Sequence, residues 1–367
     1  MDRLGTVVIG GGQAGLVMGY YLRRQGERFV ILEADERVGD SWRRRYDSLR
    51  LFSRPRYASL PGLRIPVPDC PTRDEMADYL EQYAAHFELP VHTAVRVGRV
   101  SRDEDGFLVE TDAGDYRADR VVVAAGAHVV PYRPAYAADL DPAIRQLHSL
   151  EYRNPGQLAD GTVLVVGAAN SGTDIALEAA RTNRTLLAGR HPGQVPVDID
   201  STRGHLVTPI VMFVFKHVLT RRTPMGRKAL AAMSQHGVNL VRNKLEHVEA
   251  AGIARLGRIE GVRDGYPLTA DGEVVEDVST VVWCTGSGPD HSWLDLPVFG
   301  EDGRPQHVRG IAEAEPGLMF LGLDLQFAVA SGTIQGLDRD ARYLARQIRN
   351  QARTTTRDRS PAATLAR

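Results

Sequence analysis

Two glycine-rich turns of the same kind constrain this chain more than any other feature. The first, Gly10-Gly11-Gly12-Gln13-Ala14-Gly15, follows the apolar run Thr6-Val7-Val8-Ile9. The second, Gly167-Ala168-Ala169-Asn170-Ser171-Gly172, follows Thr162-Val163-Leu164-Val165-Val166. A strand that runs through such a turn into a helix is typical of dinucleotide-binding folds. The pair predicts an α/β protein with two Rossmann-like domains, whose two nucleotides exchange a hydride.

The first turn has each feature that a dinucleotide requires. Gly10 permits the tight turn, Gly12 lets the backbone approach a pyrophosphate, and Gly15 lets the following helix pack on the strand. The pyrophosphate would lie on free N–H groups at the positive end of that helix. Glu33 ends the next strand, where a carboxylate can accept a hydrogen bond from a ribose hydroxyl. The predicted contacts are Gly10, Gly12, Gln13, Ala14, Gly15 and Glu33. The alternative is a glycine-rich turn that binds nothing.

The second turn is less regular. Ala169 stands where the middle glycine would be, and no acid ends the following strand. Arg190 is found there, beside His191, and an arginine can neutralise a 2′-phosphate. This pattern favours NADPH over NADH, whereas the alternative is a solvated arginine at a strand end. The predicted contacts are Gly167, Asn170, Ser171, Gly172, Arg190 and His191.

Composition excludes several classes of function. The net charge of −1 implies no overall attraction to nucleic acid or to anionic membranes. The two cysteines, Cys70 and Cys284, form no CxxC motif, so neither a dithiol relay nor a metal site is expected. The longest apolar stretch, 206–215, is too short to cross a bilayer. With no secretory signal at the N-terminus, we expect a cytoplasmic protein.

The remaining patterns suggest how the two nucleotide folds are connected. Val281 to Gly286 repeats the strand-then-small-residue pattern of Val121 to Gly126. We expect a discontinuous FAD domain, 1–155 and 286–350, with an NADPH domain, 156–285, inserted into it. Thr72 to Glu75 has capping-box spacing before a helix that ends near Phe87. Residues 91–119 read as antiparallel strands, 206–235 as helical, 332–349 as the last helix, and 351–367 as a disordered tail.

Both turns, together with the stretch from Gly39-Asp40-Ser41-Trp42-Arg43 through Leu51, resemble the flavin-containing monooxygenases. The resemblance is to the bacterial and YUCCA-like branch of the class B flavoprotein monooxygenases, and it extends over about 1–348. It implies that Gly39, Ser41 and Trp42 line the FAD site. Gly126 would do so too, and Asp324 would lie near the ribityl chain. The family more often has a second glycine where Asp40 stands.

The same resemblance points to three candidate catalytic residues, although the cofactors would carry the chemistry. Animal-type members have an asparagine near the position of Ser53. His148 is the part of the family's linker fingerprint that this chain keeps, and its alternative is a linker histidine bonded to backbone. Asn170 in the second turn is the third candidate. The Trp-Pro pair of the Baeyer–Villiger branch is absent, which argues against conversion of ketones to esters.

The resemblance implies an FAD-dependent, NADPH-consuming monooxygenase. A flavin C4a-hydroperoxide would pass one oxygen atom of O2 to a nitrogen or sulfur of a small organic substrate. One alternative is an NADPH oxidase, or a reductase that passes electrons to a quinone or a partner protein; another is a redox-sensing module without turnover. Segment 206–235 could be a core or interface helix, a substrate channel or a membrane-surface helix. The sequence is compatible with a homo-oligomer.

Overall fold

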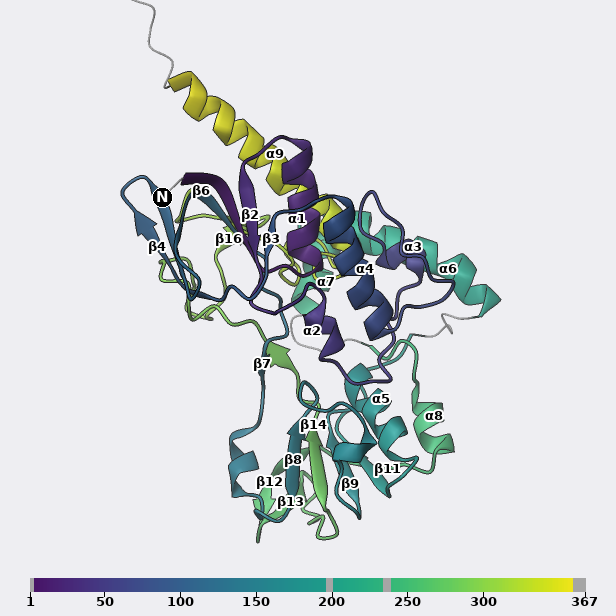
Figure 1. Cartoon of the computed structure of the whole chain (residues 1–367). Helices are drawn as coiled ribbons and strands as arrows, with labels where there is room; N and C mark the ends of the chain where they lie inside the picture. The colour runs from purple at the N-terminus through teal and green to yellow at the C-terminus, as the bar shows by residue number, and fades with distance from the viewer. Residues whose placement is uncertain (1–2, 196–200, 234–238, 359–367) are drawn as a thin grey trace, which may run out of the picture.

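The computed structural model describes residues 3–195, 201–233 and 239–358, which form two lobes, each around its own β-sheet (Figure 1). The larger sheet has nine strands, with the order β16-β17-β18-β6-β1-β2-β3. Strands β4 and β5 extend it from β6 as an antiparallel hairpin. Its strands are β1 (Arg3–Ile9), β2 (Phe29–Leu32), β3 (Val91–His92), β4 (Val97–Asp103), β5 (Gly106–Thr111), β6 (Tyr116–Val123), β16 (His307–Val308), β17 (Ile311–Ala312) and β18 (Leu318–Phe320).

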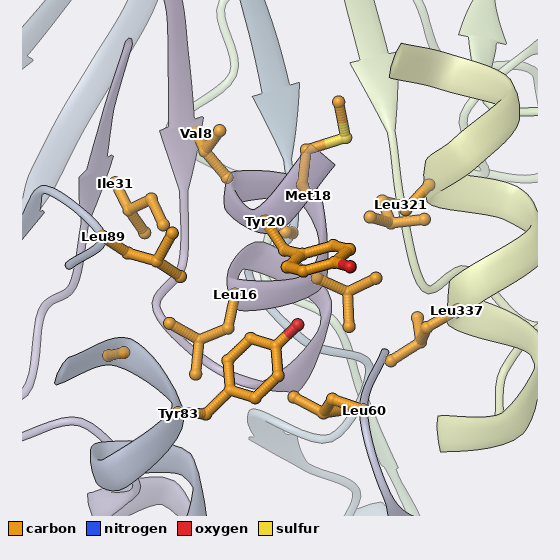
Figure 2. Close-up of a cluster of buried hydrophobic side chains, with 14 of the residues drawn as sticks. Val8, Leu16, Met18, Tyr20, Ile31, Leu60, Tyr83, Leu89, Leu321 and Leu337 are labelled. Carbon is orange, nitrogen blue, oxygen red and sulfur yellow. The ribbon is translucent and has the colours of Figure 1, made fainter. Parts of the chain in front are cut away.

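The central strands of this sheet are parallel and buried on both faces, which explains their unbroken apolar sequence. Alternate residues point to opposite faces, so Val8 and Ile31 meet the helices while Val7 and Val30 face the hairpin side. The helices of this lobe are α1 (Gln13–Arg24), α2 (Asp40–Arg43), α3 (Pro55–Ala58), α4 (Arg73–His86) and α9 (Ile334–Asp358). Figure 2 shows Leu16 of α1, Tyr83 of α4 and Leu337 of α9 in this core.

The smaller sheet is wholly parallel, with the order β11-β10-β9-β14-β8. Its edge strand β8 lies before residue 156, where the second domain was predicted to begin. Helix α5 follows β9, and helix α8 precedes β11. The elements are β8 (Arg145–His148), β9 (Val163–Val166), α5 (Asn170–Ala179), β10 (Thr185–Ala188), α8 (Leu245–Ala250), β11 (Ala254–Leu256) and β14 (Thr280–Trp283), with an added hairpin β12 (Ile259–Arg263) and β13 (Tyr266–Thr269) and short 3-10 turns Ala135–Asp139 and Pro155–Gln157.

The chain crosses between the lobes twice, and the two crossings pair with each other. Strand β7 (Val130–Pro131) leaves the first lobe, and β15 (Ser287–Gly288) returns to it as its antiparallel neighbour. The amide of Val129 donates to the carbonyl of Gly288 at 2.8 Å, and the amide of Tyr132 donates to that of Gly286 at 3.0 Å. Figure 1 shows β7 at the narrow junction of the two lobes.

Three helical predictions can be compared with the structure. The capping box is present: the Thr72 amide donates to Glu75 Oε2 at 2.8 Å, and the Glu75 amide donates to Thr72 Oγ1 at 3.2 Å. Segment 206–235 is not one helix but α6 (Thr202–Phe213), a π-turn (Val214–Val218) and α7 (Pro224–Met233), and 234–235 lie outside the described residues. Helix α9 continues to Asp358, past the point where a disordered tail was expected; 359–367 also lie outside them. Pro224 occupies the first position of α7, where its missing amide donor leaves no helical bond unmade, whereas Pro209 lies inside α6.

Candidate functional site

The three glycines of the first turn have different surroundings. Gly10 has a φ of +105°, and a Cβ there would overlap the carbonyl of Ala124 at the end of β6. A Cβ on Gly15 would overlap the carbonyl of Gly10. A Cβ on Gly12 would meet no atom within 4 Å. Gly10 and Gly15 are therefore required by the protein's own packing, whereas the space beside Gly12 is open to a ligand.

Helix α1 begins at this open position without a cap. Gly12 is the N-cap residue, no side chain accepts from the first amides, and the first turn contains no acidic residue. The first intrahelical bond runs from the Leu16 amide to the Gly12 carbonyl at 3.0 Å. The preceding amides at this helix end are the groups that commonly bind a phosphate.

Glu33 follows β2 and lies against the same turn. Its Oε2 accepts from the Gly11 amide at 2.7 Å, and its Oε1 accepts from the Asp35 amide at 2.9 Å. Burial raises the pKa of Glu33, and these two hydrogen bonds oppose that shift. Because each carboxylate oxygen can accept a further bond, the side chain retains capacity for a ribose hydroxyl.

The 39–45 stretch packs beside the start of α1. Gly39, with a φ of +91°, lies so close to α4 that a Cβ would be 2.5 Å from the Ala77 carbonyl. The indole Nε1 of Trp42 donates to Gln13 Oε1 at 3.1 Å, so Trp42 is held at the first residue of α1. Ser41 is exposed on the same short helix. Arg43 forms ion pairs with Asp40, Asp78 and Glu81 at 2.8–3.0 Å. Its guanidinium is thus occupied by carboxylates of the protein and is not free to bind a phosphate.

The loop after β18 also reaches the first turn. A Cβ on Gly322, whose φ is +89°, would lie 3.4 Å from the Cβ of Ala14. Asp324 is exposed two residues later and lies against Gly332, just before α9. Gly126, with a φ of +89°, follows β6. By contrast, Ser53 is half-buried before α3, and its side chain makes no hydrogen bond within the described ranges.

The second turn repeats the construction of the first. Gly167 has a φ of +113° and lies under the carbonyl of Cys284 at the end of β14, as Gly10 lies under Ala124. A Cβ on Gly172 would overlap the Gly167 carbonyl. Ala169 is the N-cap residue of α5, again with no side-chain cap and no acid in the first turn. The second helix end thus offers the same free amides, with one methyl group in front of them.

Asn170 is held by neighbouring backbone. Its Nδ2 donates to the Asn239 carbonyl at 3.0 Å, and its Oδ1 accepts from the Val241 amide at 3.0 Å. Both polar groups thus fasten segment 239–241 over the start of α5, next to Ser171, which is exposed. In the structure Asn170 therefore positions segment 239–241.

The end of β10 carries exposed positive charge. Arg190 is exposed, and its guanidinium has no hydrogen-bond or ion-pair partner in the part of the chain that the structure describes. His191 Nδ1 accepts from the Gly193 amide at 3.0 Å. Arg255 on the neighbouring strand β11 donates to the Gly189 carbonyl at 3.4 Å. Sequence reasoning missed Arg255, because only the pairing of β10 with β11 brings it to this corner.

His148 fastens the linker to the returning chain. It is fully buried, its Nε2 lies 3.0 Å from the Gly286 carbonyl, and its Nδ1 accepts from the Leu150 amide at 3.2 Å. A neutral ring protonated on Nε2 satisfies both contacts. Burial lowers the pKa of His148 and favours that neutral form. The geometry matches a linker histidine bonded to backbone.

A buried contact joins the loop after Trp42 to helix α5, and the sequence did not predict it. Tyr46, four residues after Trp42, donates to Asp174 Oδ2 in α5 at 2.8 Å. Asn243 also donates to this carboxylate, and Arg242 lies 3.7 Å away. Burial raises the pKa of Asp174. The Asp47 amide donates to the Arg153 carbonyl at 2.7 Å, so the loop that supports the first turn also rests on the second lobe.

The described ranges show no metal site. These residues contain no cluster of His, Cys, Asp or Glu side chains arranged to hold a metal ion. Cys70 and Cys284 are not joined in a disulfide, and burial raises the pKa of the Cys284 thiol. Across the same residues, no helix combines the length and the apolar character needed to span a bilayer.

Known proteins resemble this chain over most of its length. The profile of the pyridine nucleotide-disulphide oxidoreductase family matches residues 7–198. A CzcO-like oxidoreductase of Geobacillus kaustophilus is 37% identical, over 94% of this chain and 98% of its own. A probable indole-3-pyruvate monooxygenase of Arabidopsis thaliana, YUCCA9, is 31% identical over 82% of this chain and 80% of its own. The structure of a flavin-containing monooxygenase from Stenotrophomonas maltophilia superposes with a TM-score of 0.78 at 30% identity, over 96% of this chain and 100% of that one.

Proposed function

The chain belongs to the flavin-containing monooxygenases of the pyridine nucleotide-disulphide oxidoreductase family, and on that premise we propose that it oxygenates a nitrogen or sulfur atom of a small organic substrate. It is an FAD-dependent oxidoreductase that uses NADPH. The proposal further assigns FAD to the first glycine turn and NADPH to the second.

The observation that carries this assignment is the pair of uncapped helix ends. Both α1 and α5 begin without a side-chain cap, and in each turn the first glycine lies against the end of a neighbouring strand. The first turn has Glu33 available for a ribose hydroxyl, whereas the second has Arg190 and Arg255 near the end of β10 and no carboxylate at that strand end. This difference favours the nucleotide with a 2′-phosphate at the second turn.

The residues of the chain bind and orient the cofactors, while FAD, when bound, supplies hydride acceptance and oxygen activation. Trp42 and Gly39 would form one wall of the FAD site, and the loop through Asp324 another. The contact between Tyr46 and Asp174 holds α5, and therefore the NADPH turn, against the loop that carries Trp42. His148 keeps the two crossings together through Gly286. Fixed relative orientation of two reactants is itself a large contribution to rate.

Nitrogen or sulfur oxygenation requires no protein nucleophile, because the cofactor supplies the reactive oxygen. The absence of the Trp-Pro pair after His148 supports this chemistry over ester formation. The experiment is turnover of the FAD-loaded protein with NADPH under 18O2, with a panel of thioethers and amines. We expect a product that carries one labelled oxygen, formed in proportion to the NADPH consumed.

Two outcomes would replace the proposal. If all oxygen appears as H2O2 with every compound in the panel, the protein is an NADPH oxidase. If NADPH is consumed without oxygen only when a quinone or a disulfide is present, the protein is a reductase. The second outcome has a structural parallel, because a bacillithiol disulfide reductase of Bacillus cereus shares the fold, with a TM-score of 0.69 at 19% identity.

A further inference from the structure

Helix α6 exposes an apolar face that the proposed reaction does not use. Leu206, Ile210 and Phe213 are 72%, 65% and 59% exposed. They lie at positions i, i+4 and i+7, so they share one side of the helix. Within the described ranges, half of the exposed large hydrophobic side chains fall between Leu206 and Met225. Figure 1 shows α6 at the side of the molecule, near α3.

Helix α6 also borders a cavity, and Phe213 belongs both to this cavity and to the exposed face. A cavity of about 490 Å³ lies between α3, α6 and α9, and Met212, Phe213 and Lys216 line it. The exposed apolar face is therefore continuous, through Phe213, with the mouth of this cavity. Contiguous exposed apolar surface of this kind marks an interaction site in a soluble fold.

The stretch that contains this face carries basic side chains and no acidic ones. The sequence contains no Asp or Glu between Ser201 and Leu245, although Asp and Glu together number 46 in the whole chain. The cations of this stretch form no ion pair with a carboxylate in the described ranges, apart from Arg242 with Asp174. Arg56 of α3 lines the same cavity and rests on the ring of Tyr57, while Asp338 of α9, also in the lining, pairs with Arg342 at 3.0 Å. The cations between Phe213 and Met233 are Lys216, Arg221, Arg222, Arg227 and Lys228. Arg221 donates to the Leu325 carbonyl at 3.0 Å, and Arg222 lies over the ring of Phe327.

We propose that α6 docks this protein on an anionic phospholipid bilayer, with Leu206, Ile210 and Phe213 in the acyl boundary and the cations on lipid phosphates. Leu206, Ile210 and Phe213 share one exposed side of α6, and basic residues follow the helix in the chain. Buried apolar area together with attraction to anionic lipids is what holds a helix at a bilayer surface. A second copy of the chain fits less well, because a symmetric contact through this face would bring the same cations together. Although the net charge of the chain is −1, the field near a surface depends on the local charges.

The test is co-sedimentation of the full-length, FAD-loaded protein with vesicles of phosphatidylcholine alone or mixed with phosphatidylglycerol. We expect binding only to the anionic vesicles, with affinity that falls as salt rises. The variant Arg227→Gln/Lys228→Gln should weaken binding about five-fold per charge removed. Ile210→Glu should weaken it about ten-fold or more, because it places a charge in the apolar boundary.

The controls carry the same substitutions elsewhere on the surface. Val308→Glu changes another exposed apolar residue, and Arg304→Gln changes another exposed cation; both should bind vesicles like the wild type. Thermal unfolding checks that every variant is folded. The proposal is overturned if zwitterionic vesicles bind equally well, or if Ile210→Glu leaves binding unchanged. It is also overturned if the wild type binds no vesicles but forms a dimer, and light scattering shows that Ile210→Glu is a monomer.

Discussion

Replacing Gly12 by alanine separates cofactor binding from folding. The added Cβ would meet no protein atom within 4 Å, and Gly12 has a φ of −73°, which alanine adopts freely. The loss of stability should therefore stay within about 1 kcal/mol, the ordinary difference between glycine and alanine at an N-cap. The methyl group would, however, stand between a pyrophosphate and the free amides of α1. Loss of one hydrogen bond to a charged phosphate costs about 1.5–3 kcal/mol, or roughly a 10- to 150-fold weaker Kd for FAD.

The matched control is Gly15→Ala, which adds the same methyl group to the same turn. Its Cβ would overlap the carbonyl of Gly10, so the backbone must shift at a cost of about 1–3 kcal/mol or more. Thermal unfolding of the apoproteins and titration with FAD, followed by flavin fluorescence, measure the two quantities separately. The reasoning is refuted if Gly12→Ala binds FAD as tightly as the wild type, or if the two apoproteins lose the same stability.

Four further predictions follow from the same geometry. Ala169→Gly should tighten NADPH binding several-fold by removing the one methyl group before α5, measured as a lower Kd; an unchanged Kd would place the pyrophosphate elsewhere. Arg190→Ala should reduce the ratio of kcat/KM for NADPH to that for NADH by about ten-fold, whereas Arg184→Ala, at the other end of β10, should leave it unchanged. Tyr46→Phe should lower the free energy of unfolding at neutral pH by about 1.5–3 kcal/mol, because the buried carboxylate of Asp174 loses a hydrogen-bond donor. A loss below about 0.5 kcal/mol, the size of an ordinary surface substitution, would contradict this expectation. Burial and the charge of Arg221 lower the pKa of His307 to about 4, so below pH 6.5 the unfolded chain takes up a proton on this imidazole and the folded protein does not. The stability that this group contributes is therefore lost as pH falls from about 6.5 toward 4. Between pH 7 and pH 5, His307→Gln should lose about 1 kcal/mol less free energy of unfolding than the wild type, after allowance for solvent screening.

Local patterns in the sequence predicted the parts of the site that depend on local backbone. Gly10, Gly15 and the Thr72 capping box were predictable because each works through contacts with a few neighbouring residues or with the next strand. The place of Glu33 after the second strand followed from the length of one β-turn-α-β unit, whereas its hydrogen bond with the Gly11 amide was not predicted.

Contacts between the lobes were not predictable in the same way. Tyr46 lies in a stretch with no periodicity, and nothing in its neighbours shows that it meets Asp174. Arg255 reaches the end of β10 only through a parallel pairing of strands distant in sequence. The apolar character of 206–213 was visible in the sequence, but the sequence could not show which side of α6 stays uncovered.

The paired crossings β7 and β15 have a consequence for how such a chain could arise. Strands β6 and β18 are direct parallel neighbours in the larger sheet, and the whole smaller sheet is contained in the single connection between them. Parallel neighbours need a long connection in any case, so the host sheet keeps its strand order whether that connection is short or holds a domain. Because the connection leaves and returns through adjacent antiparallel strands, its ends lie together. A nucleotide-binding module could therefore be gained, exchanged or lost between ancestors as one cassette, without rearrangement of the older sheet.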